Sequence, residues 1–258
     1  MLAIEKPSPS GPQSGIQLLW SHLKHPDPRV KAAAAAALSP CLDHEANLRM
    51  VQDRFVISLP LLTKTLTETQ KEIEEQRALP GQVLPSAKKS VKSDAATRCE
   101  QVCRPLEEVQ ANVCAMVGNC ARSPICLGIL TQQGLLEQLA KLCKTRHEEL
   151  RKNLAYAIAN CSPHGDNCRR LGSLGCCTKL VEFLRSPDHD VRLTTSLALM
   201  QLSLDSEWWR AAAHFTCFYI ALLPSSSSSL FPSHFSPSHF LRLSCQRKTA
   251  RSCMGLML

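Results

Sequence analysis

The sequence predicts an all-α protein, a helical solenoid of about three and a half repeats of 41 residues each. Three observations lead to this prediction. A pattern of apolar residues recurs at a fixed interval, the spacing within each copy is helical rather than alternating, and glycines precede apolar segments at the same interval. The chain has 258 residues, of which 44% are hydrophobic, so it holds enough apolar material for a continuous core.

The repeat is clearest in three segments that align without gaps. Val109, Leu150 and Val191 are corresponding residues, each 41 positions after the one before. Gly134 and Gly175 show the same period. Self-similarity at this interval indicates one supersecondary unit that stacks on copies of itself.

The first helices are expected between residues 15 and 42. Gly15 opens an apolar helix, and Asp27-Pro28 begins the next one, because aspartate caps free N–H groups and proline suits the first helical position. The second of these helices is a fourth copy of the aligned segment, anchored on Val30. Its distance of 79 residues from Val109 equals one period plus a 38-residue insertion.

Each later unit is expected to contain three helices. In the last unit a short helix begins at Asn167, an apolar helix follows Gly175, and a third helix starts near Pro187-Asp188. The corresponding residues Val109, Leu150 and Val191 lie in the third helices of their units. No alternating pattern that would indicate a strand is present in residues 15–205.

This pattern resembles the armadillo repeat family. The segment GCCTKLVEFLRSPDHDVRLTTSLALMQLS has the family's glycine, apolar helix, S-P-D turn and third helix ending in A-L-x-x-L-S. The stretches LLWSHLK, LSPCL, EEVQANVCAMVGNCA and LRKNLAYAIANCS resemble more specifically the armadillo proteins that dock outer dynein arms in cilia. The resemblance covers residues 15–68 and 105–205. It implies an armadillo-type α-solenoid whose third helices line a concave, protein-binding face.

Other parts of the chain depart from the repeat. Residues 1–14 and the insertion 69–104 are expected to be disordered, the latter because it is polar, with two prolines and mixed charge. Residues 206–258 form a non-repeat, low-complexity tail, with five consecutive serines and a doubled P-S-H-F. We interpret this tail as the result of alternative splicing or of an intron-derived gene model, with a genuine lineage-specific tail as the alternative.

The repeats are therefore expected at 15–205, within a fragment of a longer solenoid. The first unit lacks its first helix, and neither end of the array has the polar face of a capping unit.

Composition and motifs exclude several classes of function. The net charge of +8 is spread along the chain without a basic block, so nucleic acid is not an expected partner. The longest apolar stretch, 208–223, is short and contains Arg210 and His214, which argues against a membrane span. Fourteen cysteines without a secretory signal indicate reduced thiols in the cytoplasm.

No catalytic or metal site is expected, and no cofactor or small-molecule substrate. Cys41, Cys120 and Cys161 occupy one column that is Leu202 in the last unit, which indicates core packing. The pair Cys99 and Cys103 is the best metal candidate but lacks a second pair of ligands close in sequence. Phosphate-binding loops and His-Glu metal motifs are absent from the sequence.

One face of the third helices carries the candidate protein-binding residues. Positions spaced i, i+4, i+7 and i+11 share a helical face. On that face lie Glu108, Asn112, Asn119, Glu149, Asn153, Tyr156, Asn160, Asp190, Thr194 and Gln201. We call Glu108, Glu149 and Asp190 the acidic row. A partner segment with basic residues would match this row, and the alternative is a solvated polar face without a partner.

A second set, Asn119, Asn160 and Gln201, forms what we call the amide row. The resemblance implies that such amides hydrogen-bond the backbone of an extended peptide, because one amide can donate and accept at once. Nuclear localisation signals are not expected ligands, since only Tyr156 offers the aromatic platform that the import receptors use.

The closer resemblance also implies partners and a location. The expected partners are coiled-coil docking subunits, the outer dynein arm and the axonemal microtubule doublet, and the expected location is the cytoplasm and the ciliary axoneme. Two alternatives stay open. One is a cytosolic armadillo adaptor that binds peptide segments in signalling or transport, and the other is a truncated product without independent function.

Overall fold

The structure is a computed structural model that describes residues 12–78 and 89–203. The predicted disordered terminus through residue 11 and the predicted tail 206–258 lie outside the described residues. Residues 12–14, which were also expected to be disordered, instead belong to the first helix, which begins at Pro12.

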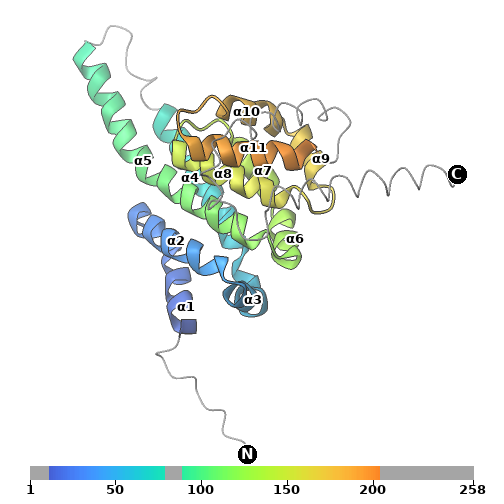
Figure 1. The fold of residues 1–258 in the computed structure, drawn as a ribbon. Coiled ribbons are helices and arrows are strands. Elements are labelled where there is room, and N and C mark those ends of the chain that lie inside the picture. The colour runs from blue at the N-terminus through green and yellow to red at the C-terminus, as the bar shows by residue number, and fades with distance from the viewer. Residues whose placement is uncertain (1–11, 79–88, 204–258) are drawn as a thin grey trace, which may run out of the picture.

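The described residues form α-helices and one short 3-10 turn, and they include no strand. The elements, shown in Figure 1, are α1 (Pro12–His22), α2 (Pro28–Asp43), α3 (Glu45–Arg54), η1 (Val56–Ser58), α4 (Pro60–Ala78), α5 (Lys89–Cys120), α6 (Pro124–Gln132), α7 (Leu135–Leu142), α8 (Glu148–Cys161), α9 (Asn167–Ser173), α10 (Cys176–Phe183) and α11 (His189–Ser203). The prediction of an all-α solenoid is confirmed.

The helix boundaries follow the predicted local signals. The Asp27 carboxylate accepts a hydrogen bond from the Arg29 N–H at 2.8 Å and caps α2, and Pro28 is its first residue. Gly134 and Gly175 both have φ of 77°, a left-handed conformation that favours glycine, and each directly precedes an apolar helix. The same backbone turn therefore connects the first and second helices of two successive units.

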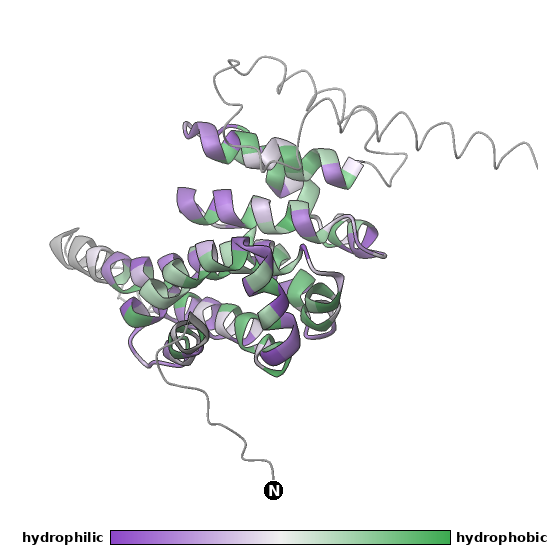
Figure 2. Cartoon of the chain, turned by 60° about the horizontal axis from the view of Figure 1, so that its bottom comes forward, coloured by the Kyte–Doolittle hydropathy of each residue, from purple (hydrophilic) through white to green (hydrophobic). Residues whose placement is uncertain are grey.

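The four third helices, α2, α5, α8 and α11, pack side by side in chain order and form the spine of the array. Figure 2 shows hydrophobic and hydrophilic residues side by side on the stacked helices, as expected for amphipathic helices in layers. The predicted cysteine column lies in this core: Cys120 and Cys161 are 0% exposed and Leu202 is 2% exposed. Cys41, in the first unit, is only half-buried.

The predicted disorder of residues 69–104 is wrong for most of that insertion. Helix α4 continues to Ala78 and α5 begins at Lys89, so the insertion lengthens two helices that pack on each other, and residues 79–88 lie outside the description. Ile73, Cys103 and Leu106 form a small buried cluster between them. Disorder was predicted from the polar composition and the two prolines of this segment, and the contribution of these few apolar residues was not recognised. We call residues 69–78 with 89–104 the α4–α5 extension.

Candidate functional site

The acidic row lies at the surface of the third helices. Glu108 and Glu149 are exposed and Asp190 is half-buried. Each carboxylate has a nitrogen-bearing side chain within reach on its own helix. Arg104 is 3.6 Å from Glu108, Lys152 is 2.7 Å from Glu149, and a ring nitrogen of His189 is 3.5 Å from Asp190. The row is thus accessible to a partner but partly neutralised by local ion pairs.

Two of the predicted site residues hold neighbouring units together. The Asn112 side chain of α5 donates a hydrogen bond to the Ala32 carbonyl of α2 at 3.1 Å. One unit later, Asn153 of α8 donates to the Ala111 carbonyl of α5 at 3.0 Å. Both are half-buried. Their amides therefore act between repeats, and Thr194, the next residue in this series, instead bonds the Asp190 carbonyl of its own helix at 2.8 Å.

The side chain of Asn119, in the amide row, makes hydrogen bonds within the protein through both of its polar groups. Its side-chain N–H₂ donates to the Ser39 carbonyl at 2.7 Å and its side-chain oxygen accepts from the Tyr156 hydroxyl at 2.7 Å. Only 6% of the residue is exposed. The prediction that it binds the backbone of a peptide is therefore not supported by the geometry, since both of its polar groups join α2, α5 and α8.

The other amide positions are also constrained. The Asn160 side chain donates to the Tyr156 carbonyl of its own helix at 3.0 Å, and Gln201 is 8% exposed. Tyr156 itself packs over Gly118, where an added Cβ would lie 2.4 Å from the ring. Burial raises the pKa of the Tyr156 phenol, which keeps it a neutral donor to Asn119. The exposed part of the candidate site is therefore the acidic row rather than the amide row.

A polar turn precedes three of the third helices and recurs with the period, whereas only its S-P-D form in the last unit was recognised from the sequence. Thr145 accepts a hydrogen bond from the N–H of His147 at 3.1 Å, and Ser186, 41 residues later, accepts from the N–H of Asp188 at 3.0 Å. His25 accepts from the N–H of Asp27 at 3.0 Å in the first unit. In each case the residue two positions before the cap fixes the turn into the helix.

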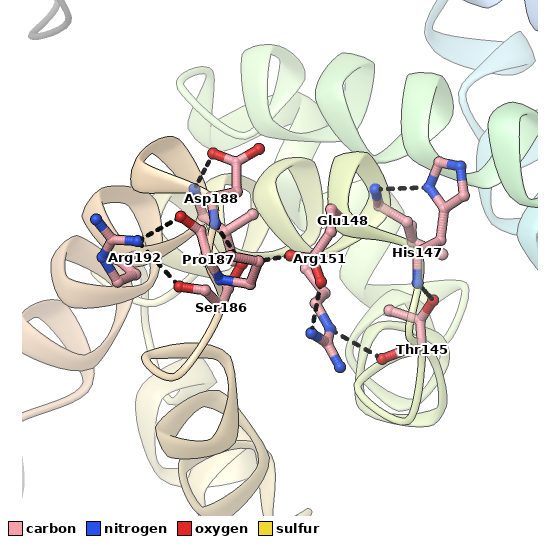
Figure 3. Close-up of polar contacts among 10 residues, drawn as sticks. Thr145, His147, Glu148, Arg151, Ser186, Pro187, Asp188 and Arg192 are labelled. Carbon is pink, nitrogen blue, oxygen red and sulfur yellow. Dashed lines mark hydrogen bonds and ion pairs between the residues drawn. The ribbon is translucent and has the colours of Figure 1, made fainter.

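Figure 3 shows that the last two of these turns are joined. The Ser186 hydroxyl donates to the Glu148 carboxylate, which also pairs with Arg151 at 2.9 Å. Arg151 and Arg192 each reach back to a carbonyl of their own turn, at Thr145 (3.1 Å) and Ser186 (2.9 Å) respectively. This network sets the register of two units along the edge that carries Glu149 and Asp190.

A surface cleft of about 550 Å³ lies between the start of α3 and the start of α6. The Arg122 guanidinium bridges it by donating to the side chain of Asp43 at 2.6 Å and to its backbone carbonyl. Ser123 caps α6 and donates to Gln52 at 3.1 Å. The cleft was not identified from the sequence, because its walls meet only through contacts between segments far apart in the chain, such as Asp43 and Arg122.

The cysteine pair that was considered for a metal has no further ligand set among the described residues. The sulfur atoms of Cys99 and Cys103 are 3.8 Å apart, beside the Gln76 carbonyl. No group of three or more His, Cys, Asp or Glu side chains suited to a metal ion occurs in residues 12–78 and 89–203. Within the same ranges, no helix combines the length and the hydropathy needed to cross a bilayer.

Comparison with known proteins gives two curated relatives, and no family model matches the chain. The armadillo repeat-containing protein gudu of Drosophila melanogaster is 29% identical over 192 residues, which are 74% of this chain and 23% of that protein. Outer dynein arm-docking complex subunit 2 of Bos taurus is 32% identical over 147 residues, 57% of this chain and 11% of that protein. The chain thus spans less than a quarter of the length of either relative.

Solved structures agree on the fold. The crystal structure of an engineered protein superposes with a TM-score of 0.50 at 20% identity, covering 83% of this chain and 94% of the other. Together, the 41-residue period, the stacked third helices and the similarity to an armadillo repeat protein identify the chain as an armadillo-type α-solenoid.

Proposed function

We propose that this chain is a non-enzymatic protein-binding scaffold that helps to dock outer dynein arms onto the doublet microtubules of motile cilia. The solenoid architecture and the similarity to an outer dynein arm-docking complex subunit support this proposal. Its partners would be coiled-coil docking subunits and, directly or through them, the outer dynein arm and the microtubule doublet. Its location would be the cytoplasm and the ciliary axoneme.

The acidic row is the observation that carries the binding role. Glu108 and Glu149 are exposed on adjacent, parallel members of the spine, 41 residues apart. Their partners, Arg104 and Lys152, belong to surface ion pairs, which contribute about 0–1 kcal/mol each. A basic side chain of a partner can therefore replace these local cations at little cost in free energy.

The rigid setting of the row adds to its suitability as a docking surface. The network of Ser186, Glu148 and Arg151 fixes the start of α8 against the start of α11. Asn153 fixes α8 against α5. Because the carboxylates are held in register before a partner arrives, less conformational entropy is lost on binding.

The binding test reverses one charge of the row. We expect Glu149→Lys to weaken binding to purified coiled-coil docking subunits by about tenfold, since a repulsive contact replaces an attractive one. Glu182→Lys is the matched control, because Glu182 is equally exposed and paired with a lysine but lies on α10 rather than on a third helix. Calorimetry at two salt concentrations measures both variants. Equal affinities for Glu149→Lys and the unchanged chain would contradict the role of the row.

A cellular test addresses docking itself. The tagged chain is expressed in motile ciliated cells, and the axonemes are then extracted with salt. Retention along the axoneme, with release together with the outer arms, is the expected result. A diffuse signal would instead favour a general peptide-binding adaptor or a product without independent function.

A further inference from the structure

The last residue of α9, Ser173, is an exposed serine that follows two arginines. It belongs to the stretch RRLGSL at residues 169–174, so that Arg170 lies three positions before it and Leu174 directly after it. Ser173 and Leu174 are both exposed. An arginine at this spacing from a serine, followed by an apolar residue, is the pattern that arginine-directed serine/threonine kinases select through charge.

This spacing is rare in the chain, and the fold separates its two occurrences. Among all the arginines of the sequence, only Arg170 and Arg192 have a serine or threonine three residues later, and these are Ser173 and Thr195. Thr195 is 0% exposed within α11, whereas Ser173 lies at the surface. Ser173 is therefore the accessible member of the pair.

The backbone around Ser173 is weakly held. Helix α9 has only 7 residues, Gly172 lies in its last turn, and Gly175 follows with φ of 77°. A Cβ added at either glycine would meet nothing within 4 Å. Because short helices are marginal in water and a helical glycine costs about 1 kcal/mol, this turn can open into the extended form that a kinase binds while the array stays folded.

We propose that Ser173 is a phosphorylation site for an arginine-directed kinase that uses ATP. The Ser173 Oγ forms a bond to the γ-phosphorus, and the bond from this phosphorus to the β–γ bridging oxygen breaks. ADP leaves with the bonding electron pair, and the hydroxyl proton passes to a base of the kinase. The Ser173 hydroxyl donates to the Arg170 carbonyl at 2.8 Å in the unmodified chain, and this hydrogen bond is lost because a phosphate ester oxygen carries no hydrogen.

The phosphate also acts on a junction between two units. The Arg170 guanidinium pairs at 2.6 Å with Glu137 of α7, in the preceding unit, and both side chains are partly exposed. A phosphate on Ser173 would stand one turn from Arg170 on the same helix, and it carries about two negative charges where Glu137 carries one. It therefore competes with Glu137 for the guanidinium and weakens the contact of α9 with α7.

The first experiment treats the intact 258-residue chain with calcium/calmodulin-dependent protein kinase II, an arginine-directed enzyme, and ATP. Mass spectrometry of proteolytic fragments then locates the phosphate. We expect phosphate on Ser173 and none on Thr195. Arg170→Ala should lower kcat/KM for Ser173 by about tenfold, because a charge-assisted contact to the kinase is lost. Arg185→Ala, at an exposed arginine outside the stretch, is the control and should leave it unchanged. Phosphorylation of a peptide of residues 165–178 without phosphorylation of Ser173 in the folded chain would overturn the proposal.

Glu137→Gln separates recognition by the kinase from loosening of the junction. This variant frees Arg170 without removing it, so Ser173 should be phosphorylated as fast as in the unchanged chain or faster. A similar loss of rate in Glu137→Gln and in Arg170→Ala would overturn recognition through Arg170, since only the ion pair would then matter.

Hydrogen exchange tests the competition for Arg170. We expect amides of residues 167–175 to exchange about threefold faster in the phosphorylated chain than in the unmodified chain, as loss of one partly exposed ion pair implies. Helix α5 from residue 105 onward should be unaffected and serves as the internal control. Equal exchange at 167–175 in the two chains would overturn the competition between the phosphate and Glu137.

Discussion

At the scale of single residues, Gly118 makes room for the Tyr156 ring of the next unit. A side chain at this position would lie 2.4 Å from the Tyr156 ring, whose hydroxyl is bonded to Asn119. Glycine therefore serves here to admit an aromatic ring rather than to allow an unusual backbone conformation. The same contact explains why Tyr156 is half-buried instead of presenting its ring to a partner.

We expect Gly118→Ala to lower the free energy of unfolding by about 1–3 kcal/mol, because the Tyr156 ring must move and its hydrogen bond to Asn119 lengthens or breaks. Gly128→Ala is the matched control: it is also within a helix, but nothing lies within 4 Å of its added Cβ. That variant should be neutral or more stable by up to about 1 kcal/mol. Urea unfolding measures both, and equal effects would show that the contact with Tyr156 is unimportant.

The buried thiols give the stability of the chain a dependence on alkaline pH. Burial raises the pKa of Cys161, which is 0% exposed, to about 12, whereas the pKa of a thiol in the unfolded chain lies near 9.0. Because the folded state holds this proton more tightly, its contribution is fully present below pH 9 and is lost as the pH rises from 9 to 12.

We therefore expect the free energy of unfolding to fall between pH 9 and 10.5, by about 1.4 kcal/mol per pH unit for each such thiol. Urea titrations under reducing conditions measure the slope. Cys161→Val removes one titrating group while keeping an apolar side chain of similar size, so its slope should be shallower than that of the unchanged chain. Identical slopes would mean that Cys161 does not contribute.

At the scale of elements, the α4–α5 extension is the largest departure from a regular unit. Figure 1 shows the N-terminal turns of α5 projecting beyond the stacked helices. The Arg77 guanidinium pairs with Glu107 at 2.7 Å, and Gln110 donates to Gln70 at 3.2 Å. Short isolated helices are marginal in water, so these contacts and the buried cluster around Ile73 decide whether the extension is helical.

Ile73→Ala is expected to uncouple the extension locally, at a cost of about 2 kcal/mol, since Ile73 is 2% exposed against Cys103 and Leu106. Hydrogen exchange should become faster in residues 69–78 and 97–104 and stay unchanged in α8. Glu72→Ala, at an exposed neighbouring position, serves as the control. Faster exchange throughout the molecule would indicate that the extension belongs to the common core.

At the scale of the whole molecule, each unit contacts only its neighbours, so stability should vary along the array. Helices α5 and α8 have a third helix packed on either side, whereas α2 has one on only one side among the described helices. The inter-unit hydrogen bonds of Asn112 and Asn153 reinforce the junctions of α5 with α2 and of α8 with α5, respectively.

We expect amide hydrogen exchange to be slowest in α5 from residue 105 onward and in α8, and faster in α1 and α2, because end units open without disrupting the rest. Asn153→Ala should accelerate exchange in α8 more than in α2. Mass spectrometry of peptic fragments measures these differences. Equal protection of α2 and α8 would instead indicate a single cooperative unit without a gradient.

Four features could be predicted without the structure: the all-α class, the 41-residue period, the position of the third helices and the core column of Cys120, Cys161 and Leu202. It could do so because burial in a solenoid follows a short, repeated pattern of local spacing and next-neighbour packing. The helical spacing also put Glu108 and Glu149 on one face, and both are exposed in the structure.

Which polar groups remain available to a partner depends on contacts between units, and these contacts are seen only in the folded chain. The side-chain amide of Asn119 is hydrogen-bonded to the Ser39 carbonyl, 80 positions away, and to the Tyr156 hydroxyl, 37 positions away. The helical α4–α5 extension and the bridge from Arg122 to Asp43 also depend on contacts between distant segments. A helical pattern shows which residues share a face, but the hydrogen-bond partner of a polar side chain depends on what the next unit places against that face.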